Sequence, residues 1–164
     1  MLQALRERRD GDRGFTLIEL MVVILIIGIL ISVGLPTFLG ARERAQDRAA
    51  QALLRNAMVA AKTWYTDAST YDGFDDTAGA ELEPSIPWVA NLGTLVGEVE
   101  VSEGDTSVTL VTLSGSGVTF CLLDVAGDAT PANNGTFYGR DPVGSGSSGC
   151  PSPDATTAVE GWTA

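Results

Sequence analysis

Residues 15–39 read FTLIELMVVILIIGILISVGLPTFL, and this stretch contains a single ionisable side chain, that of Glu19. At about 1.5 Å per residue, a helix of this length crosses a bilayer core of roughly 30 Å. A helix buried in a soluble protein keeps a polar face, whereas residues 20–27 are apolar on every side. Four arginines precede the run, and basic residues at the end of a span stay in the cytoplasm. The sequence therefore predicts a membrane-spanning helix, with the residues after it outside the cytoplasm.

A cleavable secretory signal would also begin with a short basic segment. This apolar run exceeds the usual core of such a signal, and no clear small-residue cleavage site follows it. We therefore prefer a retained membrane helix to a secretory signal.

Charge is distributed unevenly along the 164 residues, whose formal net charge is −11. Residues 71–164 carry fourteen acidic side chains and one basic side chain, Arg140. Nucleic-acid binding needs a basic surface, so we expect no nucleic-acid contact by this part of the chain. The chain has no histidine, which excludes Ser-His-Asp and Cys-His catalysis and every metal site with a histidine ligand. We expect a membrane-anchored protein that is not an enzyme and has no catalytic residues.

A helical period continues beyond residue 39 and predicts an amphipathic helix that ends near residues 65–68. Pro36 removes a backbone donor, so we expect a kink there. The stripe expected to face the rest of the protein consists mainly of alanines: Phe38, Ala41, Ala45, Ala49, Ala52, Leu53, Ala57, Ala60 and Trp64.

The remaining residues predict a loop followed by a sheet. Residues 69–97 are rich in turn formers, and we expect Tyr71, Phe74 and Trp88 to attach this loop to the sheet. Strand-like runs follow at residues 98–101, 107–113, 118–123 and 136–138. Strands joined by short turns favour an antiparallel meander, and a helix packed across such a sheet gives an α+β fold.

Glu19 interrupts the apolar run, and we expect no partner for its carboxylate along its own helix. A charge at the bilayer centre costs at least about 2.5 kcal/mol, so such a residue is functional by default. The alternative is a position near the membrane edge, where the side chain reaches the lipid headgroups at little cost.

The segment Gly14-Phe-Thr-Leu-Ile-Glu-Leu20, between the basic leader and the apolar run, closely resembles the class III signal of type IV pilins, which type II secretion pseudopilins share. The resemblance covers residues 13–39 well and the rest only in broad architecture. It implies that a prepilin peptidase cleaves after Gly14 and that Phe15 is then N-methylated. It also implies assembly roles for Phe15, Thr16, Glu19, Gly28 and Pro36.

In the family, the glutamate of one subunit neutralises the amino terminus of a neighbour, here Glu19 and Phe15. The segment from Gly28 to Pro36 would lose helicity when subunits pack into a filament. The resemblance thus divides the chain into a leader (1–14), a membrane and filament-core helix (15–39), an amphipathic helix (40–68), a loop (69–97) and a sheet with a carboxy-terminal region (98–164).

Cys121 and Cys150 are the only cysteines, and outside the cytoplasm we expect them to form a disulfide. It would close a loop of about 30 residues and contribute roughly 3 kcal/mol. Two separate buried thiols are the alternative. We expect the acidic clusters at residues 72–76 and 98–105 to be solvated, with no metal site and no cofactor, although Ca²⁺ binds the head of some pseudopilins.

We expect a structural subunit that polymerises into a type IV pilus on the cell surface. The expected partners are further copies of the pilin, the prepilin peptidase, the pilus assembly machinery and the cytoplasmic membrane. A type II secretion pseudopilin, or a minor or competence pilin, stays open as an alternative. A membrane-tethered binding module with a pilin-like anchor is a second alternative.

Overall fold

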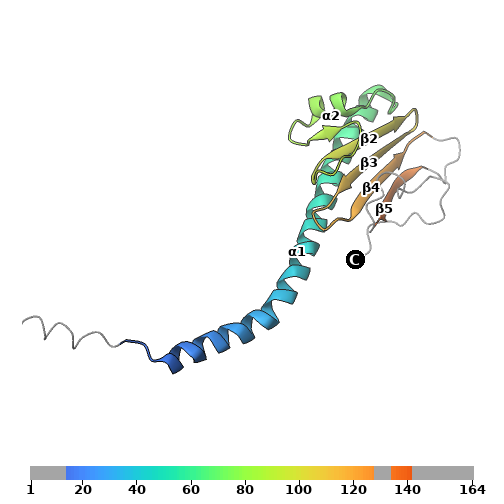
Figure 1. Ribbon diagram of the computed structural model, residues 1–164. Helices are drawn as coiled ribbons and strands as arrows, with labels where there is room; N and C mark the ends of the chain where they lie inside the picture. Colours follow the sequence, from blue (N-terminus) through green and yellow to red (C-terminus); the bar gives the residue numbers. More distant parts are fainter. Residues whose placement is uncertain (1–13, 128–133, 142–164) are drawn as a thin grey trace, which may run out of the picture. The chain divides into compact units, whose positions relative to one another are not determined.

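The computed structural model describes residues 14–127 and 134–141. The chain divides into two compact units, Met1–Ala41 and Arg42–Ala164. Helix α1, Leu17–Ala68, begins in the first unit and ends in the second (Figure 1). The described residues from Arg42 onward are called the head below.

The part of α1 in the first unit exposes its apolar side chains on all sides. Among the described residues, α1 is the helix that is long and apolar enough to cross a membrane. Pro36 lies inside α1, and the helix is assigned without a break across it. Such a surface requires lipid or other apolar helices around it, because water would face almost every side chain.

The part of α1 in the head buries a face that coincides with the predicted stripe only in its second half. Its buried side chains are Ala50, Leu54, Ala57, Met58, Ala60 and Ala61. Ala45, Ala49 and Ala52 of the predicted stripe are exposed, as are Phe38 and Ala41 before the head, so that prediction was wrong for these residues. Ala57 and Ala60 are buried, and Leu53 and Trp64 are partly buried against the core, as predicted. The larger side chains Leu54 and Met58 bury more apolar area than alanine, and they determine which face turns inward.

The head contains one five-stranded sheet in the order β1-β2-β3-β4-β5. Its strands are β1 (Trp88–Val89), β2 (Val99–Gly104), β3 (Ser107–Leu113), β4 (Thr119–Val125) and β5 (Gly135–Asp141). Strands β2 to β5 form the predicted antiparallel meander, whereas β1 pairs parallel with β2. The observed β2, β4 and β5 extend two to three residues beyond the predicted ends, because the ladder pairing continues there.

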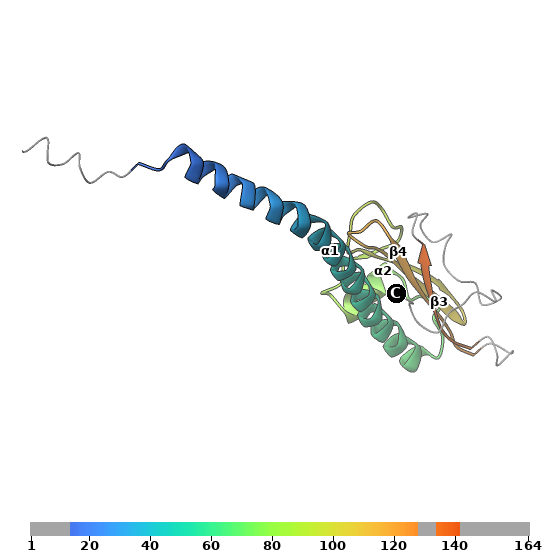
Figure 2. The same cartoon turned by 90° about the horizontal axis from the view of Figure 1, so that it is seen from below.

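The core lies between α1 and one face of the sheet (Figures 1 and 2). Alternate residues along a strand share a face, which is why every second side chain of β2, β3 and the middle of β4 reaches the helix. These side chains are Val99, Val101, Val108, Leu110, Phe120 and Leu122. The α+β fold predicted from the sequence is confirmed.

Residues 69–97 are more ordered than the predicted loop. They contain helix α2, Asp76–Leu82, as well as the short strand β1. The carboxylate of Asp75 accepts a hydrogen bond from the Ala78 backbone at 2.8 Å and so caps the helix. Gly79 lies against the Trp88 ring, where an added Cβ would come within 2.6 Å of the indole. The short helix therefore forms where a cap and a close contact with an aromatic ring coincide.

The three aromatic residues expected to anchor this segment are all buried, as predicted. Phe74 packs edge-on against Trp88, with ring centroids 5.7 Å apart, and also contacts Trp64 of α1. Tyr71 packs against Tyr65 of α1 with the rings tilted by 38° and their centroids 4.8 Å apart. Aromatic contacts of this kind attach the segment to both the helix and the sheet.

Candidate assembly site

The first turn of α1 contains a reciprocal cap made by Thr16 and Glu19. Oε2 of Glu19 accepts hydrogen bonds from the backbone nitrogen and from Oγ1 of Thr16, both at 2.8 Å. Oγ1 of Thr16 in turn accepts one from the Glu19 nitrogen at 3.2 Å. This is a capping box, which satisfies backbone donors that the first turn would otherwise leave free.

The expectation that Glu19 has no partner on its own helix was therefore wrong. The spacing Thr-x-x-Glu before an apolar run is the sequence signal for such a cap, and it was present. Both contacts use Oε2, and within the described residues no hydrogen bond reaches Oε1. The carboxylate can thus hold the cap and still accept a further donor from another chain.

Gly14 and Phe15 lie immediately before this cap and are exposed. Phe15 is 90% exposed, so its side chain has no packing partner within one described chain. The structure places Phe15, Thr16 and Glu19 together at the start of α1, while Gly28 and Pro36 lie farther along the same helix. The loss of helicity from Gly28 to Pro36, and the roles of all five residues in assembly, stay predictions.

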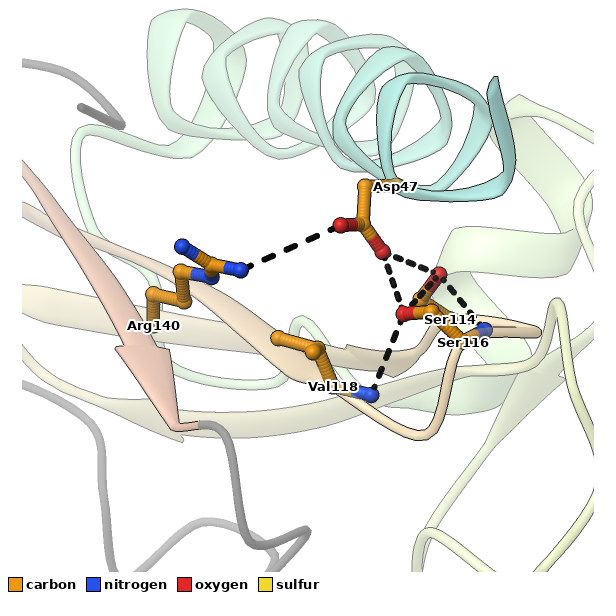
Figure 3. A network of polar contacts seen from close by, with 5 residues as sticks. All are labelled: Asp47, Ser114, Ser116, Val118 and Arg140. Carbon is orange, nitrogen blue, oxygen red and sulfur yellow. Dashed lines mark hydrogen bonds and ion pairs between the residues drawn. The ribbon is translucent and has the colours of Figure 1, made fainter. Parts of the chain in front are cut away.

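Two polar networks attach the sheet to the head part of α1, and sequence reasoning missed both. In the first, Asp47 of α1 accepts hydrogen bonds from the hydroxyls of Ser114, at 2.8 Å, and Ser116, in the β3–β4 turn (Figure 3). Nη2 of Arg140 in β5 lies 4.0 Å from Oδ2 of the same carboxylate. The Val118 nitrogen donates to Ser116, which stabilises the turn that presents these hydroxyls.

The second network surrounds Asp124, which is buried in β4. Its carboxylate accepts a hydrogen bond from the Tyr71 hydroxyl at 2.5 Å and another from Thr136. Nζ of Lys62 in α1 lies 3.0 Å away and forms an ion pair with it. Burial, and secondly the bond to Asp124, raise the pKa of Tyr71 well above its usual range. Asp124 therefore joins α1, the segment after it, β4 and β5 at one point.

The cysteines and the acidic clusters complete the set of predicted site residues. Cys121 is buried in β4, whereas Cys150 lies outside the described residues, so their disulfide stays a prediction. Asp75 caps α2, and Glu100 accepts a hydrogen bond from the Leu92 nitrogen at 3.0 Å. In the described part of the chain, no three Asp, Glu or Cys side chains are grouped so that they could hold a metal ion.

Comparison with known proteins adds independent evidence at the amino terminus. Residues 9–35 match the family model of the prokaryotic N-terminal methylation motif. The chain is 32% identical over 90 residues to the type IV major pilin protein PilA of Myxococcus xanthus. The matched stretch covers 55% of this chain and 41% of that relative. It is 38% identical over 100 residues to the type IV major pilin protein PilE1 of Neisseria gonorrhoeae, covering 61% of this chain and 58% of the relative.

A third relative comes from a secretion system. The chain is 35% identical over 81 residues to the type II secretion system core protein G of Klebsiella michiganensis, covering 49% of this chain and 57% of that protein. The chain spans about half the length of these curated relatives. The chain has a methylation motif at its amino terminus, a long apolar helix and an antiparallel sheet, and over the compared parts it is similar to type IV major pilins.

Proposed function

We propose that the chain is a structural subunit of a type IV pilus, which acts by polymerisation and not by catalysis. The observation that carries this proposal is the first turn of α1, where a capped carboxylate with one open oxygen begins a helix whose apolar side chains are exposed on all sides up to Leu39. Such a helix is stable in lipid before assembly and among other apolar helices afterwards.

We further propose the order of the steps from processing to assembly. A prepilin peptidase removes residues 1–14, the amine of Phe15 is methylated, and the head stays outside the cytoplasm while α1 spans the membrane. The pilus assembly machinery then transfers α1 into the filament core, and the heads form the filament surface. The methylation motif over residues 9–35 and the pilin relatives support this sequence of events.

Within the filament, Glu19 has two tasks that the structure allows at once. Oε2 caps the helix of its own subunit through Thr16, and Oε1 accepts the positively charged amine of Phe15 from a neighbour. Leaving one partner of a buried ion pair alone costs about 3–5 kcal/mol, so the contact selects the axial register at which subunits pack.

Three variants of the full chain, produced in its native host, separate the two tasks. Glu19→Gln keeps a side chain that serves in a capping box but removes the charge. Glu19→Ala removes both the cap and the charge, and Thr16→Val removes only the hydroxyl of the cap. Surface filaments are sheared, imaged and quantified, and membrane fractions are probed for cleaved subunit.

If Glu19 pairs with the amine of a neighbour, the Gln and Ala variants should both lose filaments severely, while Thr16→Val should lose far fewer. Cleaved subunit should accumulate in the membrane for all three. Normal filaments from Glu19→Gln with a loss only in Glu19→Ala would show that the carboxylate serves as a cap alone. Absence of filaments from the unmodified chain, with its machinery present, would contradict the pilus proposal.

A pseudopilin of a type II secretion system is the second candidate, supported by the similarity to core protein G of Klebsiella michiganensis. A Ca²⁺-loaded head would favour it. We propose that the head needs no cofactor, so its unfolding midpoint should be the same in Ca²⁺ and in a chelator. A rise in the midpoint with Ca²⁺, or a secretion defect on deletion of the gene without loss of surface filaments, would favour the pseudopilin.

A further inference from the structure

The head part of α1 has a basic face near its start. Arg44 and Arg48 lie four residues apart and therefore on one side of the helix, and Arg55 continues the same side. All three side chains are exposed. Within the described residues, neither Arg44 nor Arg48 forms an ion pair. Arg44 and Arg48 are called the basic stripe.

The other end of α1 is acidic. The last turn of the helix contains Asp67 and no basic residue, although the carbonyl end of a helix favours a cation. The segment after the helix contacts the β2–β3 turn, because Oγ1 of Thr70 and the nitrogen of Tyr71 donate to the Asp105 carbonyl at 2.8 and 3.2 Å. This contact gathers four exposed acids, called the acidic end: Asp67, Asp72, Glu103 and Asp105.

These two surfaces are too far apart to neutralise each other within one head. Arg44 and Asp67 are separated by about 35 Å along a straight helix of 1.5 Å rise per residue. Exposed charges are screened over roughly 8 Å at physiological salt. No ion pair to the four acids is found in the described part of the chain. The acidic end therefore lacks the cation that a helix carboxy terminus favours.

The positions of the basic stripe and the acidic end favour one relative orientation of two neighbouring subunits. Two copies that face each other through the same patch would bring like charges together, which is repulsive. Two copies stacked head to tail bring the acidic end of one against the basic stripe of the next. Contacts between two different patches generate open filaments when the rotation does not close. The charge pattern of the head thus matches the polymer that its apolar helix is expected to form.

We propose that the basic stripe of one subunit binds the acidic end of a second copy of this chain in the filament. This inference rests on the proposed pilus function and adds to it a contact between heads, separate from the pairing of Glu19 with Phe15. The arginines supply the cations missing from the carboxy terminus of α1 in the neighbouring copy.

A charge-exchange experiment in the native host tests the contact. One variant carries Arg44→Glu and Arg48→Glu, a second carries Asp72→Lys and Asp105→Lys, and a third carries all four changes. Glu81→Lys, at an exposed acid of α2, is the matched control. Each double variant should lower the amount of sheared filament at least about tenfold, as roughly 1.4 kcal/mol per subunit addition would. The fourfold variant should recover most of the loss, and the control should resemble the unmodified chain.

Head folding is checked by the thermal midpoint of each purified chain in detergent, which should stay within a few degrees. Filaments in normal amount from either double variant would overturn the inference and leave the pilus proposal standing. Loss in both double variants without recovery in the fourfold variant would overturn it as well, because the two patches would then not face each other. Absence of filaments from the unmodified chain would defeat the pilus proposal, and the inference with it.

Discussion

Replacing Asp124 by alanine removes the carboxylate that joins four segments of the head. In the native protein it accepts the hydroxyl of Tyr71 at 2.5 Å and that of Thr136, and it pairs with Lys62 at 3.0 Å. Asp124 and Tyr71 are both buried, whereas the Lys62 side chain is 51% exposed. The variant would leave the Tyr71 hydroxyl buried without an acceptor, whereas the ammonium group of Lys62 would still be hydrated.

The expected loss in the free energy of unfolding is the sum of three contributions, one from each contact. A buried donor left without its partner costs about 1–3 kcal/mol, and the partly buried contact with Thr136 adds about 0.5–1.5 kcal/mol. The ion pair with the half-exposed Lys62 adds at most about 1 kcal/mol because water screens it. Asp124→Ala should therefore lower the free energy of unfolding by about 2–5 kcal/mol. For a head of this size, the thermal midpoint should fall by at least about 8 °C.

The measurement is guanidinium unfolding of the full chain in detergent, followed by tryptophan fluorescence. Glu81→Ala, which removes an exposed carboxylate, is the control and should change the free energy by less than about 0.5 kcal/mol. Asp124→Asn keeps an acceptor for the Tyr71 hydroxyl, so its free energy of unfolding should lie between those of Asp124→Ala and Glu81→Ala. Equal free energies of unfolding for Asp124→Ala and Glu81→Ala would refute the claim that this network holds the sheet against α1.

Two further predictions concern pH and oxidation. The pKa of Tyr71 is raised by burial, so above pH 10 the unfolded chain loses a proton that the folded chain keeps, and the free energy of unfolding should fall by up to about 1.4 kcal/mol per pH unit. Tyr71→Phe should remove this contribution, and parallel alkaline stability curves for the two proteins would contradict it. We also expect Cys121 and Cys150 to be bonded, so thiol labelling of the unfolded, unreduced protein should find no free thiol and Cys150→Ser should lower the free energy of unfolding by roughly 3 kcal/mol. Two labelled cysteines would contradict the disulfide.

The long helix and the meander could be predicted because each leaves a periodic or continuous apolar pattern in the sequence. The face that α1 buries in the head was harder to predict, because alanine is compatible with both exposure and burial. Ala45 and Ala49 were predicted to be buried and are exposed, while Leu54 and Met58 turn inward. Weighting the larger apolar side chains above alanine would have given the correct face.

The polar networks could not be predicted from local patterns. Asp124 is 62 residues from Lys62 and 53 from Tyr71, and nothing in the sequence near any of the three indicates the contact. Asp47 likewise reaches Ser114 and Ser116 only because α1 crosses the β3–β4 turn. The cap at the start of α1 is different, since Thr-x-x-Glu before an apolar run is a local signal from which it could have been predicted.

We propose above all that this chain is processed at Gly14 and polymerises into surface filaments. The most direct measurement is mass spectrometry of the amino-terminal peptide of filaments sheared from cells that express the chain. We predict that the sheared filaments contain this chain and that its amino-terminal peptide begins at an N-methylated Phe15. Filaments in which this chain still begins at Met1, or surface filaments that lack the chain although it is present in the membrane, would contradict the account.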